Sequence, residues 1–183
     1  MQMMYEKNGI ILKVLREKSA PQVLEFLTRN RDFFDKYEIS KQDNYYTTAF
    51  QKKTLQAEAA ALLQGTAIRF YCFTAKNPDE IIGTVSFQNI RRGGFMSCQI
   101  GYKIDKAHTR QGLGRKCVSL ALDAITRDYE IHRVEAYIMP DNIASIELAK
   151  SVGFVPEGIA YDFAKINNNW ENHLRYIYIS AYQ

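Results

Sequence analysis

The chain has 183 residues, with 24 Lys or Arg and 20 Asp or Glu, so its formal net charge at pH 7 is only +4. This length predicts one domain over residues 1–183 with a full hydrophobic core. The small charge excess argues against a dedicated nucleic-acid-binding protein.

The three cysteines predict a reducing compartment. Cys72, Cys98 and Cys117 show no C-x-x-C spacing and have no histidine partner at metal-binding spacing, so we expect buried free thiols and no metal site. No apolar run reaches the length of a membrane span, and residues 1–5 lack the charged and apolar regions of a signal peptide. We therefore expect a cytoplasmic protein that contacts no membrane.

The N-terminal part of the chain predicts a strand followed by a helix. Residues 10–15 show the alternation of a strand. Ser19 then predicts a helix N-cap, because Pro21 stands in the first turn and Gln22 completes a Ser-x-x-Gln capping box. Residues 31–46 are aromatic and charged without clear periodicity, which predicts a helix end followed by a loop.

A second helix and a three-stranded meander are predicted next. Residues 48–64 carry apolar side chains at helical spacing, and Gly65 fits the end of that helix. Turn signals at Asn77-Pro78-Asp79 and Arg91-Arg92-Gly93-Gly94 separate three strands, at residues 67–74, 82–90 and 95–104. Alternation in the last strand places one set of side chains on a single face: Met96, Cys98, Ile100, Tyr102 and Ile104.

Residues 99–115 predict an anion site. They run from a strand end through a basic glycine turn into a long helix that begins near Gly112. Converging N–H groups and the helix dipole make such a turn attractive to phosphates, and Arg110 and Arg115 add charge. The turn is not a Walker A loop, because Gly-Lys-Ser/Thr is absent, and Cys117 stands where G-x-G-x-x-G needs its third glycine. These differences argue against ATP and NAD.

The C-terminal part predicts a strand, a short helix and a hairpin. Residues 133–139 form the strand, and Asn142 caps the helix. The last two strands, residues 157–165 and 173–180, flank a turn at Asn167-Asn168-Asn169. The order β-α-α-β-β-β-α-β-α-β-β predicts a mixed α/β sheet. A meander before the glycine turn argues against a Rossmann unit, in which that turn follows the first strand.

Three groups of motifs follow one another along nearly the whole chain. They read Ile100-Gly101-Tyr102 with Arg110-Gln111-Gly112-Leu113-Gly114, then residues 132–145 with Gly153-Phe154-Val155-Pro156-Glu157-Gly158, and finally Asn169-Trp170-Glu171-Asn172-His173. In this order they resemble the GNAT N-acetyltransferases and, among these, the RimJ/RimL type of ribosomal-protein-alanine N-acetyltransferases. The resemblance implies a GNAT-like fold with a splayed central sheet.

The resemblance also implies a site for acetyl-CoA as cosubstrate. Acetyl-CoA would lie in a splay between the strand that ends at Ile104 and the strand that contains Val134. The pantetheine would make strand-like contacts with the backbone of Tyr102, Lys103 and Ile104. The pyrophosphate would lie near Arg110, held by the N–H groups of Gln111, Gly112, Leu113, Gly114 and Arg115. The polar side chains toward the cofactor would be Asn142 and Ser145.

By the same resemblance, an amine attacks the thioester directly. A backbone N–H near Ile104 would stabilise the oxyanion, and Ser145 would donate to the departing sulfur. Many relatives have a Tyr general acid seven residues after the Asn, but this position is Ala149 here, so that mechanism is not available from it. The alternative is that Asn142 and Ser145 only start a helix, because both residue types are favoured there.

The group that accepts the proton stays open. Where some relatives carry Glu on the fifth strand, this chain has Tyr137, and Glu135 lies on the same face two residues earlier. RimL-like enzymes carry Glu at a position that matches Ala164, and Asp162 precedes it by two residues on the same face. We name Glu135, Tyr137 and Asp162 as candidates. Each acid could also be a solvated surface group, and water could accept the proton, because an α-amine has a pKa of about 8.

The sequence thus predicts an acetyl-CoA-dependent N-acetyltransferase whose acceptor is a protein N-terminal α-amine, for example that of a ribosomal protein. Two alternatives stay open: an acetyltransferase for a small amine such as a polyamine, amino acid or antibiotic, and a CoA-binding module without turnover. We expect no nucleic-acid partner, and a homodimer is left open as the oligomeric state.

Overall fold

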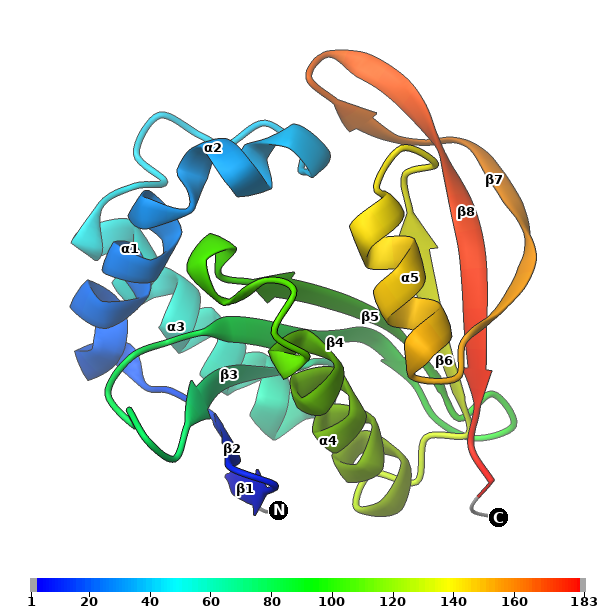
Figure 1. Cartoon of the computed structure of the whole chain (residues 1–183), viewed down its shortest axis with the longest axis horizontal. Coiled ribbons are helices and arrows are strands. Elements are labelled where there is room, and N and C mark those ends of the chain that lie inside the picture. The colour runs from blue at the N-terminus through cyan, green and yellow to red at the C-terminus, as the bar shows by residue number, and fades with distance from the viewer. Residues whose placement is uncertain (1–2, 182–183) are drawn as a thin grey trace.

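One eight-stranded sheet organises the computed structural model, which describes residues 3–181 (Figure 1). Its strands are β1 (Met4–Lys7), β2 (Ile10–Lys13), β3 (Ile68–Thr74), β4 (Gly83–Arg91), β5 (Ser97–Ile104), β6 (Arg133–Ile138), β7 (Val155–Ile166) and β8 (Asn169–Ile179). They lie in the order β1-β2-β3-β4-β5-β6-β8-β7, and only β5 and β6 pair in parallel. Residues 1–2 and 182–183 lie outside the described residues. The predicted domain includes all four of them, and the stretch expected to lack a signal peptide includes residues 1–2.

Helices pack on both faces of the sheet. They are α1 (Ala20–Arg29), α2 (Arg31–Phe34), α3 (Thr48–Gln64), α4 (Leu113–Arg127) and α5 (Ile143–Ser151), with short 3-10 turns η1 (Glu17–Ser19), η2 (Asp35–Tyr37) and η3 (Lys106–His108). In Figure 1, α4 and α5 lie in front of the sheet and α3 lies behind it. The front core joins Cys117 of α4 to Ile100 of β5, whereas the rear core joins Leu55 of α3 to Tyr71 of β3.

The predicted mixed α/β sheet is confirmed, and most elements begin and end within a few residues of the predicted bounds. The second helix spans the predicted residues, with Thr47 as its N-cap and Gly65 at a φ of 70° as its C-cap. The alternation in β5 is also confirmed, because Cys98 and Ile100 are buried in the front core while Tyr102 and Ile104 pack against it. The two Asn of the last turn, at residues 167 and 168, both have positive φ, as a tight hairpin requires.

Two expectations at the N-terminal end need correction. The chain begins with a hairpin of β1 and β2, in which Asn8 and Gly9 have φ of 52° and 76°. A type I′ turn requires positive φ at both positions, so the Asn-Gly dipeptide could have revealed it. The capping box is wrong, because Ser19 makes no side-chain bond at the start of α1 and Gln22 Nε2 donates to the Asp79 carbonyl. Ser19 ends η1 with a ψ of 5°, so it lacks the extended backbone of an N-cap.

The three cysteines are free and buried, as predicted. In residues 3–181, no group of three or more His, Cys, Asp or Glu side chains is arranged to hold a metal ion. Within the same residues, no helix combines the length and the apolar character that crossing a membrane would need.

The central strands β5 and β6 separate halfway along their length. Their parallel pairing joins only residues 97–100 to residues 133–136. Beyond this point β5 continues beside β4 as far as Ile104, and β6 continues beside β8 as far as Ile138. The splay predicted for the central sheet is therefore present, and it leaves one edge of β5 without a neighbouring strand.

Candidate active site

The free edge of β5 offers backbone groups to a ligand. In an antiparallel pair, successive residues point their N–H and C=O groups alternately toward and away from the partner strand. Asp105 N donates to Ile82 O (2.9 Å), and this contact fixes the alternation. The backbone groups of Tyr102 and Ile104 therefore point away from β4, into the splay where β6 no longer pairs. This edge fits the strand-like contacts expected with a pantetheine, and the N–H of Ile104 fits an oxyanion donor.

The turn before α4 presents further backbone donors. Arg110 and Gly112 have left-handed backbone, with φ of 58° and 72°, and α4 begins at Leu113. The first N–H groups of a helix have no acceptor within the helix, and they lie at the positive end of its dipole. Arg110, Gln111 and Arg115 are exposed around them. The turn thus fits a pyrophosphate group, which needs several converging donors and positive charge.

Gly114 serves the packing of α4. A Cβ at this position would lie 3.2 Å from Ile104 Cγ1 and 3.3 Å from Leu148 Cδ2. The missing side chain lets α4 approach both the end of β5 and helix α5. Leu113 packs against the front core. Both residues therefore fix where the first turn of α4 lies, and only their backbone N–H groups remain for a ligand.

Helix α5 brings a pair of hydroxyls to the splay. Asn142 Oδ1 accepts from Ser145 N (3.2 Å), so Asn142 caps the helix as predicted. Ser145 Oγ donates to Tyr102 Oη (3.0 Å), and Tyr102 Oη donates to Ser145 O (2.9 Å). Burial raises the pKa of Tyr102 to about 12, so the phenol keeps its proton at neutral pH. Sequence reasoning used only the backbone of Tyr102, although its place on the core face of β5 was a signal for the side chain.

The face of the sheet opposite α4 and α5 carries a polar cavity. Gln99, Glu135 and Tyr137 lie on this face, because the residues between them on β5 and β6 point into the front core. The cavity has a volume of about 390 Å³ and is lined by Asn89, Arg91, Cys98, Gln99, Glu135, Tyr137 and Arg175. It lies on the other side of the sheet from the Ser145–Tyr102 pair.

Glu135 and Tyr137 share a face, as predicted, and touch. Tyr137 Oη donates to Glu135 Oε2 (2.9 Å), and Arg133 Nε donates to Glu135 Oε1 (2.8 Å). Burial alone would raise the pKa of Glu135, but these hydrogen bonds and the charge of Arg133 outweigh it and lower the pKa. Arg133 also pairs with Glu157, which pairs with Arg175 (2.8 Å). The carboxylate of Glu135 is therefore ionised at neutral pH within a row of alternating charges across β6, β7 and β8.

Asp162 lies apart from this row. The pairing of β7 with β8 slips between Ala160 and Ala164, and Asp162 has a φ of 45° inside this bulge. Strict alternation does not hold across a bulge, so it does not assign Asp162 to the face of Ala164. The side chain of Asp162 is exposed, whereas the next residue, Phe163, stacks on Tyr137 with ring centroids 4.2 Å apart. The structure thus brings Phe163, and not Asp162, to the Glu135–Tyr137 pair.

The side chain of Lys103 is a feature that sequence reasoning missed. It lies on the same face as Gln99 and pairs with Glu38 from the loop after η2, and Lys41 pairs with Glu38 as well. Burial lowers the pKa of Lys103 to about 8, against the opposing charge of Glu38. Burial would raise the pKa of Glu38, but the two lysines lower it. No local pattern links Glu38 to Lys103, so a single sequence carries no signal for this cluster.

Comparison with known proteins finds relatives over almost the whole chain. Residues 10–155 match the family model described as an acetyltransferase (GNAT) domain. The chain is 36% identical to the probable N-acetyltransferase YjcK of Bacillus subtilis (strain 168). The alignment spans 170 residues and covers 93% of each chain. It is 30% identical over 168 residues to the ribosomal-protein-uS5-alanine N-acetyltransferase of Escherichia coli (strain K12), which covers 90% of this chain and 84% of that one.

Solved structures share the fold. The ribosomal-protein-S5-alanine acetyltransferase from Vibrio fischeri superposes with a TM-score of 0.92 at 25% identity, over 99% of this chain and 98% of that one. RimJ of Mycobacterium smegmatis, solved in complex with CoA-disulfide, superposes with a TM-score of 0.89 at 20% identity, over 95% and 84% of the two chains.

Proposed function

The chain belongs to the GNAT acetyltransferase family, and we propose that this N-acetyltransferase transfers the acetyl group of acetyl-CoA to the N-terminal α-amine of a protein. The observation that carries the proposal is the splay between β5 and β6. Backbone donors and the glycine turn lie on its front side, and the polar cavity with Glu135 and Tyr137 lies on the other. Donor and acceptor can thus approach one thioester from opposite faces of the sheet.

On the front side, the chain binds and orients the donor. The backbone of Tyr102 and Ile104 contacts the pantetheine, and the first turn of α4 holds the pyrophosphate. Acetyl-CoA supplies the activated acetyl group. The N–H of Ile104 stabilises negative charge on the acetyl oxygen. The Ser145 hydroxyl, which here donates to Tyr102 Oη, turns to donate to the departing sulfur, while the Tyr102 phenol keeps its hydrogen bond to Ser145 O and holds the start of α5 in place.

On the cavity side, Glu135 receives the proton of the acceptor amine, directly or through a water. Its lowered pKa makes it a weak base, but it is ionised at neutral pH and can hold an ammonium group near the splay. An α-amine has a solution pKa of about 8, so a fraction of it is neutral at pH 7 without help. Glu135 then accepts the proton that the amine releases after its bond to the acetyl carbon has formed. Tyr137 orients the carboxylate through its hydrogen bond. We assign no proton transfer to Asp162.

A protein N-terminus is the acceptor that the relatives favour. The Escherichia coli relative is named for the alanine of a ribosomal protein, and the match extends over 90% of this chain. A ribosomal protein is therefore our first choice of acceptor.

A panel of acceptors tests the proposal. Purified protein is incubated with acetyl-CoA and free thiol is followed, using peptides with Ala, Ser or Met at the N-terminus, and spermidine, free amino acids and an aminoglycoside. We expect turnover with N-terminal peptides. The matched control is the same peptide with a blocked N-terminus and a free lysine, which should not react. Turnover of a small amine together with none of any peptide would contradict the proposal.

A further inference from the structure

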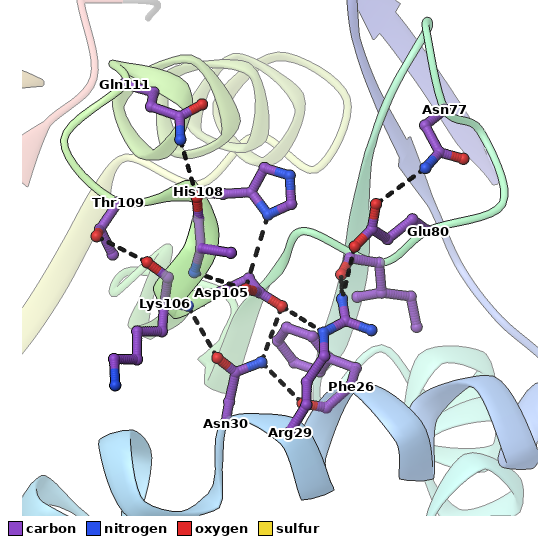
Figure 2. Close-up of polar contacts among 12 residues, drawn as sticks. Phe26, Arg29, Asn30, Asn77, Glu80, Asp105, Lys106, His108, Thr109 and Gln111 are labelled. Carbon is purple, nitrogen blue, oxygen red and sulfur yellow. Dashed lines mark hydrogen bonds and ion pairs between the residues drawn. The ribbon is translucent and has the colours of Figure 1, made fainter.

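A buried carboxylate just beyond the splay takes part in none of these steps. Asp105 follows β5 directly and is only 2% exposed. Its Oδ2 accepts from Arg29 Nε (2.6 Å) and from Asn30 Nδ2 (2.9 Å), and its Oδ1 accepts from Ala107 N (2.9 Å), as Figure 2 shows. Burial alone would raise the pKa of Asp105, but the hydrogen bonds from Asn30 and Arg29 lower it. The group is therefore a fully engaged anion between the end of α1 and the loop that leads to α4.

Asn30 makes a second connection between the same two segments. It is 1% exposed, and its Oδ1 accepts from Lys106 N (2.8 Å). Its Nδ2 donates to Asp105 and also to Phe26 O (2.9 Å) within α1. Because side chains at the end of α1 form hydrogen bonds with this distant loop, they fix the loop relative to the helix.

The hydrogen bonds continue from Asp105 to the glycine turn. Thr109 Oγ1 donates to Lys106 O (2.9 Å), and Gln111 Nε2 donates to Ala107 O (2.8 Å) (Figure 2). Gln111 is the residue directly before Gly112, at which α4 is capped. An unbroken series of contacts thus runs from α1 to the backbone donors of the turn.

We propose that Arg29, Asn30 and Asp105 form a latch that holds the glycine turn in its binding shape before CoA arrives. The three are positioning residues, because they act on the pyrophosphate only through residues 106–112. A turn that is ordered in advance saves the entropy of ordering it on binding. The inference rests on the proposed use of acetyl-CoA.

The variant Asp105→Asn tests the latch by calorimetry with CoA, with ADP as a diphosphate probe, and with pantetheine, which has no diphosphate. Donors from Arg29, Asn30 and Ala107 all face this carboxylate, so an amide leaves at least one of them without an acceptor. We expect CoA and ADP to bind about tenfold more weakly, and pantetheine as in the wild type. The matched control is Glu80→Gln, which removes a 3.4 Å ion pair of Arg29 outside the latch and should change none of the three affinities.

A second variant and a measurement on the wild type complete the test. Asn30→Ala keeps the Arg29–Asp105 pair, so we expect about a threefold loss for CoA and ADP only. In the ligand-free wild type, hydrogen exchange at the amides of Lys106 and Ala107 should already be slow. Equal weakening of CoA and pantetheine, unchanged CoA affinity in both variants, or protection of these amides only after CoA is added would overturn the latch. A wild type that binds no CoA would instead refute the proposed function.

Discussion

The two sides of the splay are built from different materials. The front side consists of backbone groups: the free edge of β5, the left-handed residues Arg110 and Gly112, and the first turn of α4. The cavity side consists of charged side chains that come from separate strands and loops, with Glu157 held by Arg133 and Arg175, and Glu38 held by Lys103. Backbone geometry follows from local sequence, whereas the charge clusters exist only once distant segments meet.

This difference has a functional consequence. A backbone cradle recognises a ligand that never changes, and it tolerates replacement of most side chains around it. A cavity of side chains changes its preference with each substitution. We therefore expect changes on the cavity side to alter turnover and acceptor choice while leaving CoA binding intact, and the predictions below probe that separation.

The largest effect is expected for Glu135→Gln. Loss of the carboxylate should lower kcat by about 100-fold, because general-base assistance contributes typically 10²- to 10⁴-fold, while the calorimetric affinity for CoA stays at the wild-type value. The readouts are thiol release at saturating peptide and CoA calorimetry. Glu157→Gln is the control, since it leaves both hydrogen bonds of Glu135 in place and should change kcat by less than about twofold. A wild-type rate in Glu135→Gln would assign the proton to water.

An intermediate effect is expected for Tyr102→Phe and Ser145→Ala. Each removes one hydroxyl of the front pair, and each should lower kcat about tenfold with nearly unchanged CoA affinity, because Ser145 donates to the leaving sulfur in the transition state and Tyr102 holds Ser145 in place. The hydroxyls touch, so the double variant should lose less than the product of the two single losses. Normal turnover in Ser145→Ala would reduce Ser145 to a helix-start residue.

How far the sequence predicts the molecule follows from the same contrast. Residues 48–64 and the glycine turn carry local signals, namely helical periodicity, a terminal Gly65 and paired glycines, and the structure has the helix and the turn where these signals place them. The splay of the central sheet is predicted only through the family resemblance. The Asn8-Gly9 dipeptide is a local signal for the first hairpin, but the sequence prediction did not use it.

The cavity side was harder to predict for physical reasons. Glu135 and Tyr137 lie two residues apart on one strand, so alternation sufficed to place them together. Strand alternation also predicts that Asp162 lies on the same face as Ala164. A bulge at Asp162, where φ is positive, breaks this alternation, and Phe163 lies beside Tyr137 instead. The pair of Lys103 and Glu38 depends on how α2 and its loop pack on the sheet, which no pattern in either segment specifies.

The smallest effect is expected at Lys103, whose side chain lies on the cavity face. Its backbone groups point toward β4 and not into the splay, so the expectation that they contact the pantetheine is wrong for this residue. Its pKa of about 8 in the folded protein is below the value of about 10.4 of an unfolded lysine. Between these pH values the unfolded chain binds more protons, so this group makes the free energy of unfolding rise with pH. In urea unfolding, wild type should therefore gain stability relative to Lys103→Met from pH 8 to pH 10.

Lys150 is the control of opposite sign. Glu147 raises the pKa of Lys150, so the contribution of this pair to the free energy of unfolding is lost at high pH. A difference between wild type and Lys103→Met that does not change with pH would mean that Lys103 stays charged beside Glu38 over this whole range.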